Sequence, residues 1–221
     1  MAQRRKFQRS CDIVVSFSAI LILALPMAFV MLLIKISDRG PAIFSQQRIG
    51  REGKPFWLYK FRTMKVNHNG PSITPDGDPR ITSVGRVLRH WKIDELPQLW
   101  NILLGDMTII GPRPEVARFV RTYSPEQRRL LQFTPGLASL SQLVYSHEAE
   151  MLQGQQNPEE AYTQQLLPKK IAVDLEYEKR RTVWTDIRLL AEMAVFISFG
   201  QSYRTDRNFR ILTSEKNRSL P

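Results

Sequence analysis

Residues 13–34 read IVVSFSAILILALPMAFVMLLI, a run without a charged side chain between Asp12 and Lys35. A straight helix of that length extends roughly 33 Å, which is about the thickness of the hydrocarbon core of a bilayer. The run therefore predicts a membrane helix near one end of the chain. The mean hydropathy of the whole sequence is -0.28, so we do not expect a chain that crosses the membrane many times.

Pro26 interrupts this run just past its middle. Its ring clashes with the preceding helical turn and removes one backbone hydrogen bond, which leaves pieces of roughly 20 and 12 Å that are each too short to span a bilayer. Both flanks of the run are basic, with Arg4, Arg5, Lys6 and Arg9 before it and Lys35, Arg39, Arg48 and Arg51 after it. The positive-inside rule places both flanks in the cytoplasm. A re-entrant helix that bends at Pro26 satisfies both conditions, and a kinked spanning helix is the alternative.

The net charge of +11 over 221 residues indicates an anionic partner. Nucleic acid, a phosphorylated substrate and an anionic membrane surface all fit a charge of this sign. The length fits one domain with an anchor. The single cysteine, Cys11, excludes a disulfide within the chain, so the sequence gives no indication of an oxidising compartment.

The remainder of the chain has the pattern of a mixed, mostly helical α/β protein. We expect short strands at 42–44 and 56–61, a polar functional loop at 67–80, and a basic, frayed tail at 200–221. Helical patterns occupy the segments 84–90, 96–104, 125–132 and about 160–198. Gly105 is the expected stop signal of the second of these helices.

The densest group of charged side chains surrounds two adjacent acids, Asp94 and Glu95, placed just before Pro97 at a predicted helix start. Acids favour this position in any helix because the dipole is positive there, so the pair alone does not establish a site. Basic side chains that can hold an anionic substrate lie close by in the sequence, at Lys60, Arg62, Arg86, Arg89 and Lys92.

Two proline-containing turns add further arginines. Pro112 and Pro114 enclose Arg113 and stiffen its backbone, so that its planar guanidinium can be aimed at a phosphate or carboxylate. Arg80 follows Asp78 and Pro79 in a second turn. A solvated surface arginine is the simpler interpretation of either turn taken alone.

Four motifs in this order carry a family resemblance: KFRTM at 60–64, DPRIT at 78–82, DELPQL at 94–99 and GPRPE at 111–115. Together they resemble the bacterial sugar transferases, or monotopic phosphoglycosyl transferases, over roughly residues 10–195. No further membrane domain precedes the matching region, so the chain looks like the minimal form of the family. After residues 134–137 many members continue with a Gly-Trp-Ala-Gln-Val-like run, whereas this chain has ASLSQLV at 138–144.

The resemblance implies a basic N-terminus with a re-entrant membrane helix at 1–36, a catalytic domain at 37–199 with helices in the membrane interface, and a basic tail at 200–221. It implies the cytoplasmic face of the bacterial inner membrane. The implied reaction moves a sugar-1-phosphate from a UDP-sugar to polyprenol (undecaprenyl) phosphate and releases UMP, with Mg²⁺ as cofactor. It proceeds through a phosphosugar bound covalently to an aspartate.

Site residues follow from the same resemblance. Asp94 is the expected nucleophile, and Glu95 its metal-binding or acid–base partner, with both acids as candidate metal ligands. Lys60 and Arg89 are expected to orient the acids. The arginines expected to bind substrate are Arg113, at the nucleotide end of the donor, together with Arg80 and Arg62.

Two other classes of function remain open at this stage. A membrane-tethered nucleic-acid-binding protein fits the charge, but the basic residues form no stripe with interleaved aromatic residues, so we expect no nucleic-acid partner. A catalytically silent scaffold of an envelope assembly is the second alternative. Expected partners are the donor, the lipid acceptor and anionic membrane lipids, and the sequence leaves room for a homodimer.

Overall fold

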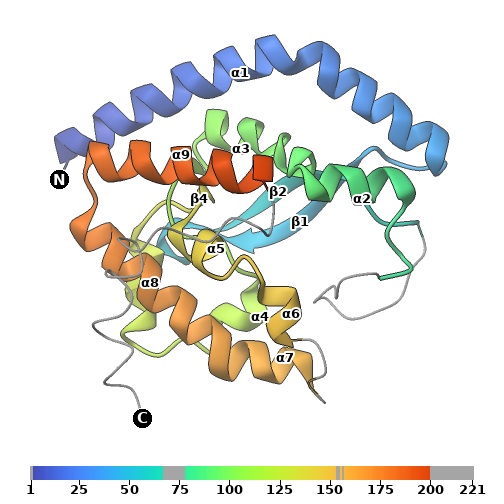
Figure 1. The fold of residues 1–221 in the computed structure, drawn as a ribbon. Helices are drawn as coiled ribbons and strands as arrows, with labels where there is room; N and C mark the ends of the chain where they lie inside the picture. Colours follow the sequence, from blue (N-terminus) through green and yellow to red (C-terminus); the bar gives the residue numbers. More distant parts are fainter. Residues whose placement is uncertain (1, 67–77, 153–154, 156, 200–221) are drawn as a thin grey trace.

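The computed structural model describes residues 2–66, 78–152, 155 and 157–199. The tail at 200–221 and most of the loop at 67–80 lie outside these residues. The first element, α1 (Ala2–Ser37), is one continuous helix with Pro26 inside it. Figure 1 shows α1 as a bent blue helix arching over the rest of the protein. The expected separation into two helices is therefore wrong: the chain bends but stays helical, since a proline removes only one hydrogen bond of the ladder.

One segment of α1, Phe7–Ser37, is long and apolar enough to cross a membrane by length and composition, and an 18-residue stretch within it has a mean hydropathy of 2.7. Large apolar side chains along it face outward, including Phe17, Ile22, Leu25 and Phe29. An isolated soluble helix would not present such a surface to water, because unburied apolar area is unfavourable.

The N-terminal part of α1 is fixed to the rest of the protein by polar contacts. The Asp12 carboxylate is buried and accepts hydrogen bonds from the hydroxyl of Thr108 (2.7 Å) and the backbone N–H of Ile109 (3.1 Å). Gln8 donates to the same hydroxyl at 2.7 Å, and Arg9 donates to the carbonyl of Leu103 at 2.7 Å. The second end of α1 leads directly into the following sheet.

That sheet is an antiparallel hairpin of β1 (Ile43–Ile49) and β2 (Pro55–Phe61), joined by the 3-10 turn η1 (Arg51–Gly53). In its register Ile43 pairs with Phe61 and Ile49 with Pro55. The two predicted strands are confirmed, and the first is longer than expected. The residues that lengthen β1 are mostly polar, and they lack the alternating hydrophobicity that predicts a strand.

The acids lie between two short helices, α2 (Ser83–His90) and α3 (Gln98–Leu104). Both helices were predicted, and Gly105 ends α3 in the left-handed conformation with φ 96°, as expected. The predicted start of α3 is wrong by two residues, because the chain first forms the 3-10 turn η2 (Ile93–Glu95).

A second, two-stranded sheet pairs β3 (Thr108–Ile110) in parallel with β4 (Gly136–Ala138), and the sequence pattern did not predict it. The connection between them contains α4 (Ala117–Val120) and the 3-10 turn η3 (Gln127–Gln132). The segment predicted as an amphipathic helix at 125–132 is therefore a 3-10 turn. Just after β3, a Cβ on Gly136 would lie 2.1 Å from the backbone nitrogen of Gly111, so only glycine permits this approach.

The C-terminal half is helical, as predicted, but consists of several pieces. They are α5 (Leu140–Val144), α6 (Glu148–Leu152), α7 (Pro158–Ala161), the π-helical turn η4 (Tyr162–Leu166), α8 (Leu167–Arg180) and α9 (Val183–Phe199). A break between α8 and α9 divides the segment expected as helical from 160 to 198. The mixed, mostly helical fold class is confirmed.

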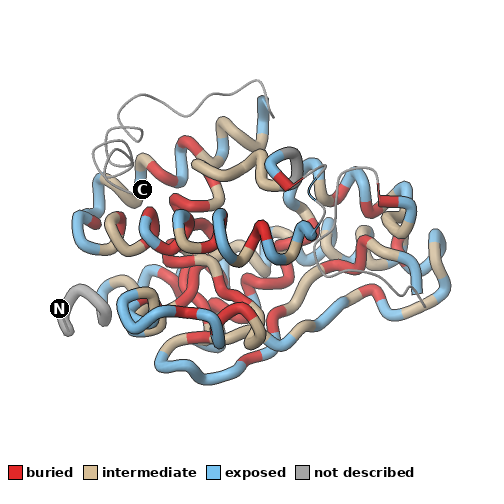
Figure 2. The backbone as a smooth tube through the Cα atoms, turned by 90° about the horizontal axis from the view of Figure 1, so that it is seen from below, coloured by how far each residue is buried: buried red, intermediate tan, exposed pale blue. Residues whose placement is uncertain are grey.

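The core lies where the strands meet the surrounding helices. Figure 2 shows the buried residues gathered in the middle of the molecule and exposed residues along the outer helices. One apolar cluster joins β2 and α3 through Phe56, Leu58 and Ile102, and another joins β3, α5 and α9 through Ile110, Leu140 and Leu189. Packing from both sides thus fixes the loops that follow β2 and β3.

Candidate active site

Asp94 and Glu95 are buried, with 7% and 8% of their surfaces exposed. They lie in η2, one 3-10 turn ahead of α3, which agrees with their predicted place just before Pro97 at a helix start. The turn begins at Lys92, whose φ of 55° places it in the left-handed region. A residue with a Cβ is strained there, and such strain is often found near functional sites.

Glu95 is held by two cations from separate segments. The Arg113 guanidinium donates to both carboxylate oxygens, from Nη2 to Oε1 at 2.8 Å and from Nη1 to Oε2 at 3.2 Å. The Lys60 ammonium, from β2, donates to Oε1 at 2.8 Å. Burial opposes ionisation of Glu95, but Arg113 and Lys60 together lower its pKa well below the ordinary value. Glu95 is therefore a fixed carboxylate anion.

Asp94 has a different environment. Its carboxylate accepts no hydrogen bond from the residues that the structure describes, and its nearest cation is Lys60, with Nζ 4.0 Å from Oδ2. Burial raises the pKa of Asp94, Lys60 lowers it, and the charge of Glu95 raises it further. The two adjacent acids thus differ: Glu95 is fully paired, and Asp94 keeps its oxygens available for another group.

Arg89 lies on α2 next to this pair. Its Nε donates to the hydroxyl of Thr63 at 2.9 Å, and its positive charge acts on Asp94 and lowers that residue's pKa. Thr63 follows β2, so the bond ties α2 to the strand that carries Lys60. Thr63 belongs to the KFRTM motif at 60–64, but the sequence alone does not indicate this role.

Arg62 and Arg80 are engaged elsewhere. Arg62 lies 3.4 Å from the Asp38 carboxylate and also donates to the Asp38 carbonyl, at the end of α1. Arg80 forms a close ion pair with Asp78, at 2.6 Å. Of the seven predicted site residues, four are brought together by direct contacts, namely Lys60, Asp94, Glu95 and Arg113. Arg89 adjoins them, whereas Arg62 and Arg80 pair with acids outside this cluster.

Asn101 supports β2, the strand that carries Lys60. The sequence gave no specific signal for this role. Its fully buried amide donates to the carbonyl of Trp57 at 2.7 Å and accepts from the backbone N–H of Tyr59 at 3.1 Å. Both groups belong to β2, on either side of Leu58. The side chain of Asn101 therefore satisfies the edge of β2 and joins the Lys60 strand to the helix that follows the acids.

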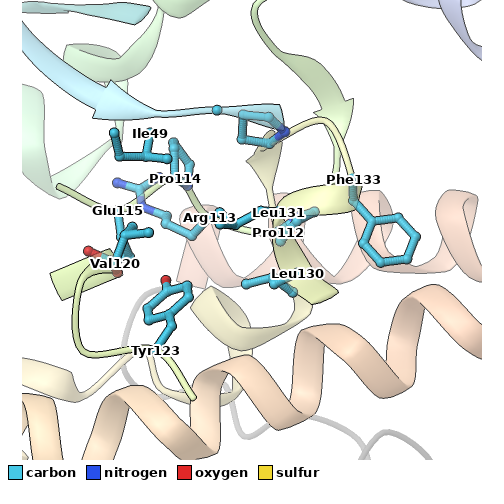
Figure 3. A pocket seen from close by; sticks show the side chains of 12 residues that line it. Ile49, Pro112, Arg113, Pro114, Glu115, Val120, Tyr123, Leu130, Leu131 and Phe133 are labelled. Carbon is cyan, nitrogen blue, oxygen red and sulfur yellow. The ribbon is translucent and has the colours of Figure 1, made fainter. Parts of the chain in front are cut away.

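The Arg113 loop is supported from its other side by a polar network. Glu115 accepts a hydrogen bond from the hydroxyl of Tyr162 at 2.5 Å and lies 3.7 Å from Arg48. A small pocket of about 270 Å³, partly open to solvent, adjoins this loop. Figure 3 shows Arg113 in this pocket with Glu115 and Tyr123 near it and apolar side chains around them.

The sequence profile described as bacterial sugar transferase matches residues 3–200. The chain belongs to the bacterial sugar transferase family. Its resemblance to that family, inferred from four short motifs, is confirmed.

Curated relatives of this sugar transferase include three whose names state an activity. A UDP-glucose:undecaprenyl-phosphate glucose-1-phosphate transferase of Caulobacter vibrioides is 39% identical over 72% of this chain and 57% of its own length. The enzyme of the same name from Escherichia coli K12 is 34% identical over 88% of this chain and 40% of its own. An undecaprenyl-phosphate galactose phosphotransferase of Salmonella typhimurium is 34% identical over 86% and 40%. The chain thus spans about half the length of these relatives, or less.

The donor set at the centre of this sugar transferase fits a magnesium ion. Mg²⁺ is usually held by one or two carboxylates together with substrate phosphate oxygens and water, without a dedicated protein cage. Asp94 and Glu95 supply two adjacent carboxylates, and the described residues contain no larger group of metal-ligating side chains. The arrangement therefore suits a metal that arrives with a phosphorylated substrate.

Proposed function

We propose that this chain transfers a sugar-1-phosphate from a UDP-sugar to undecaprenyl phosphate and releases UMP, as the first membrane step of a bacterial glycoconjugate. The single observation that carries the proposal is the contrast between the two adjacent acids. Glu95 is neutralised by Arg113 and Lys60, whereas Asp94 is buried beside them with no close partner among the described residues. A nucleophile needs free lone pairs next to cations that can hold an anionic substrate.

In this proposal an Asp94 carboxylate oxygen attacks the phosphorus that bears the sugar. A new oxygen–phosphorus bond forms, the phosphoanhydride bond breaks, and its electron pair leaves with UMP. The phosphate oxygen of undecaprenyl phosphate then attacks the same phosphorus, and the Asp94 carboxylate leaves. Lipid diphosphate-sugar results, and the enzyme returns to its first state.

The other side chains stabilise charge in both steps. Lys60 and Arg89 hold Asp94 in place and favour its anionic form, and Arg113 binds phosphate oxygens at the nucleotide end of the donor. Arg62 and Arg80 are further candidates for donor contacts, which requires that they exchange their carboxylate partners for phosphate. Positioned cations act most strongly in a buried site, where the dielectric constant is low.

Mg²⁺ is part of the proposal. Asp94 and Glu95 would hold it together with the donor diphosphate, and it would supply charge neutralisation of the phosphoryl oxygens. Glu95, which Arg113 holds in the structure, would contribute its carboxylate to the metal, and Arg113 would bind the nucleotide phosphate.

We further propose that α1 is re-entrant and that the catalytic residues lie on the cytoplasmic face of the inner membrane. The N-terminal part of α1 contacts the same body of the protein as the residue that follows its C-terminal end, through Asp12 to Thr108 and Asp38 to Arg62. A straight spanning helix would separate its ends by the thickness of the bilayer. The four tryptophans, each at least 46% exposed, are Trp57, Trp91, Trp100 and Trp184. Such exposure suits contact with lipid headgroups and does not suit core packing.

The test is a reaction with Mg²⁺ and a UDP-sugar in the absence of lipid acceptor. We expect up to one equivalent of UMP and the mass of a phosphosugar on the peptide that contains Asp94. Asp94→Asn should abolish both signals, while Glu95→Gln should slow turnover, and Asp106→Asn, a control acid beyond α3, should change neither. Donors should include UDP-glucose and UDP-galactose, because the relatives' names specify different sugars.

Steady-state kinetics with both substrates separate this mechanism from its alternatives. Parallel double-reciprocal lines are expected for two successive displacements. Intersecting lines, no adduct and an active Asp94→Asn variant would together exclude Asp94 as the nucleophile. Absence of any UMP release, with salt-sensitive DNA binding instead, would favour the nucleic-acid alternative, and absence of both would favour a silent scaffold.

A further inference from the structure

Arg48 is a half-buried arginine of β1 that the proposed mechanism does not use. Its Nη1 donates to the backbone carbonyl of Pro114 at 3.1 Å. Its Nε and Nη2 donate to the Oε1 of Gln46 at 3.1 and 2.8 Å. Pro114 is buried, and a buried carbonyl needs a donor. One guanidinium therefore joins the hairpin to the residue that follows Arg113.

The backbone of the next residue in β1 makes a second contact with the same loop. The N–H of Ile49 donates to the carbonyl of Glu115 at 2.9 Å, and the two residues form an isolated antiparallel bridge. The GPRPE loop thus lies against the edge of β1 that β2 leaves open, where backbone groups need a partner. Ile49, Pro114 and Arg113 also line the same small pocket (Figure 3). Two consecutive residues of β1 therefore hold the two consecutive carbonyls after Arg113.

The same hairpin carries Lys60, the other cation that binds Glu95. Arg48 pairs with Phe56 across the sheet, and Phe56 and Lys60 alternate onto the same face of β2. Directly paired residues point to one face, so Arg48 and Lys60 extend from the same face of the hairpin. Along β2 the two positions are about 13 Å apart. The hairpin therefore positions both cations of Glu95, Lys60 directly and Arg113 through Arg48.

Arg48 also lies beside a carboxylate. Its Nη1 is 3.7 Å from Oε2 of Glu115, whose Oε1 accepts a hydrogen bond from the hydroxyl of Tyr162 at 2.5 Å. At 3.7 Å the contact between Arg48 and Glu115 is an ion pair and not a hydrogen bond. The bond to the Pro114 carbonyl is shorter, at 3.1 Å. Compensation of the Glu115 charge is therefore a competing role for Arg48, which a variant of Glu115 can separate from positioning.

We propose that Arg48 is a positioning residue for the transfer reaction: it holds the GPRPE loop against β1, so that the Arg113 guanidinium reaches Glu95 and the donor phosphates. The inference rests on the proposed function, because that function gives Arg113 its substrate. Pro112 and Pro114 restrict the backbone on both sides of Arg113, so a displacement of the Pro114 carbonyl moves Arg113 with it. Misplacement by about 1 Å can reduce a rate by about a hundredfold.

The experiment is a double-mutant cycle on kcat/KM for UMP release. Arg48→Met keeps an apolar stem but removes every donor, and we expect a loss of about ten- to a hundredfold. In the Arg113→Lys background the same change should cost less than about twofold, because the guanidinium that Arg48 positions is already absent. Equal losses in both backgrounds would overturn the proposal, since a general loss of stability acts independently of Arg113.

Glu115→Gln separates positioning from charge compensation. This variant removes the negative charge and keeps an acceptor oxygen for the hydroxyl of Tyr162. If Arg48 positions the loop, the loss in Arg48→Met should remain at about tenfold or more when Glu115→Gln is added. A wild-type rate in the combined variant would overturn the proposal, because compensation of the Glu115 charge would then be the whole role of Arg48.

Gln46 and Gln47 supply a milder variant and its matched control on the same strand. Gln46→Ala removes the acceptor that orients the Arg48 guanidinium and should cause a smaller loss, which again disappears in Arg113→Lys. Gln47 is exposed on the opposite face of β1, and Gln47→Ala should leave kcat/KM unchanged. The Gln46 cycle provides the test if Arg48→Met does not fold, and equal losses in its two backgrounds would contradict the proposal.

Hydrogen–deuterium exchange tests the inference apart from the proposed function. The Ile49 amide, which donates to the Glu115 carbonyl, should exchange faster in Arg48→Met, while peptides of α2 should be unchanged. Unaltered exchange at Ile49 would overturn the inference whatever the rate of the variant. Faster exchange in a protein whose wild type releases no UMP would reject the proposed function and the catalytic role given to Arg48, but not its hold on the loop.

Discussion

Arg113 and Glu95 form a two-point ion pair, with Nη2–Oε1 at 2.8 Å and Nη1–Oε2 at 3.2 Å. The pair joins the loop after β3 to the turn before α3, two segments that the core holds in place from opposite sides. Its geometry matches the planar fork of guanidinium to the two oxygens of a carboxylate, which an ammonium group cannot reproduce.

Arg113→Lys should therefore reduce kcat/KM for the UDP-sugar by about ten- to a hundredfold, since it keeps the charge and loses one or two charge-assisted hydrogen bonds. Initial rates of UMP release over a range of donor concentrations measure this. Arg180→Lys, on the exposed face of α8, is the matched control and should be neutral. A wild-type rate in Arg113→Lys would show that the role of Arg113 is structural.

The backbone of Lys92 should be strained, because its φ is 55°, and the side chain is exposed. Substitution by glycine should relieve this strain. Lys92→Gly is expected to be more stable than Lys92→Ala by about 0.5–1 kcal/mol, since both lose the charge but only glycine is unstrained in this conformation. Thermal melting of the two variants in the same detergent gives the comparison. Equal melting temperatures would show that the turn at Lys92 relaxes at no cost.

Asp174 should give the protein a specific pH dependence of stability. Burial raises its pKa to about 6 against the pull of Ser141 and Lys170, compared with an ordinary value of 3.8. The folded state thus favours the protonated form, and the stability that protonation contributes is complete below about pH 3.8 and lost as pH rises through 6. The full difference amounts to roughly 3 kcal/mol.

Melting temperatures of wild type and Asp174→Asn between pH 4.5 and 7.5 test this directly. The wild type should lose stability relative to Asp174→Asn as pH rises. Glu176→Gln is expected to show the opposite sign: burial opposes the shift, but Arg180 and Lys179 lower the pKa of Glu176, so its contribution is lost as pH falls. A pH-independent difference between wild type and Asp174→Asn would contradict the prediction.

Pro26 should control the topology of α1. Pro26→Ala restores a backbone donor and removes a steric clash, so it should favour a straight helix and increase the fraction of molecules that span the bilayer. Single cysteines near residues 5 and 45, in a Cys11→Ala background, report accessibility from outside intact cells. Both positions should be protected in the parent protein, and position 5 should become labelled in Pro26→Ala.

Labelling of position 5 in the parent protein would establish a spanning helix and reject the re-entrant arrangement. The polar contacts of Asp12 with Thr108 and Ile109 oppose the straightening, since a spanning helix must break them. Asp12→Ala combined with Pro26→Ala should therefore increase outside labelling beyond Pro26→Ala alone.

The candidate site could be predicted only in part. Lys60, Asp94, Glu95 and Arg113 lie in motifs whose residue types and order resemble a known family, and the structure brings these four together. Asn101 left no such signal, because a lone polar residue in a helical pattern predicts an exposed position. Its burial depends on which strand edge lies opposite it, and this is a property of the packed structure.

The sequence by itself determined the long apolar helix near one end, the strands β1 and β2, α2, the end of α3 at Gly105 and the family to which the chain belongs. These features rest on local chemistry: apolar length, turn residues, helix stops and short motifs. Only the tertiary structure decided that Asp94 has no close partner among the described residues while Glu95 is bound by Arg113 and Lys60, and that β3 pairs with β4. Contacts between distant segments cost loop-closure entropy that only the complete packed core offsets, and a local pattern therefore cannot specify them.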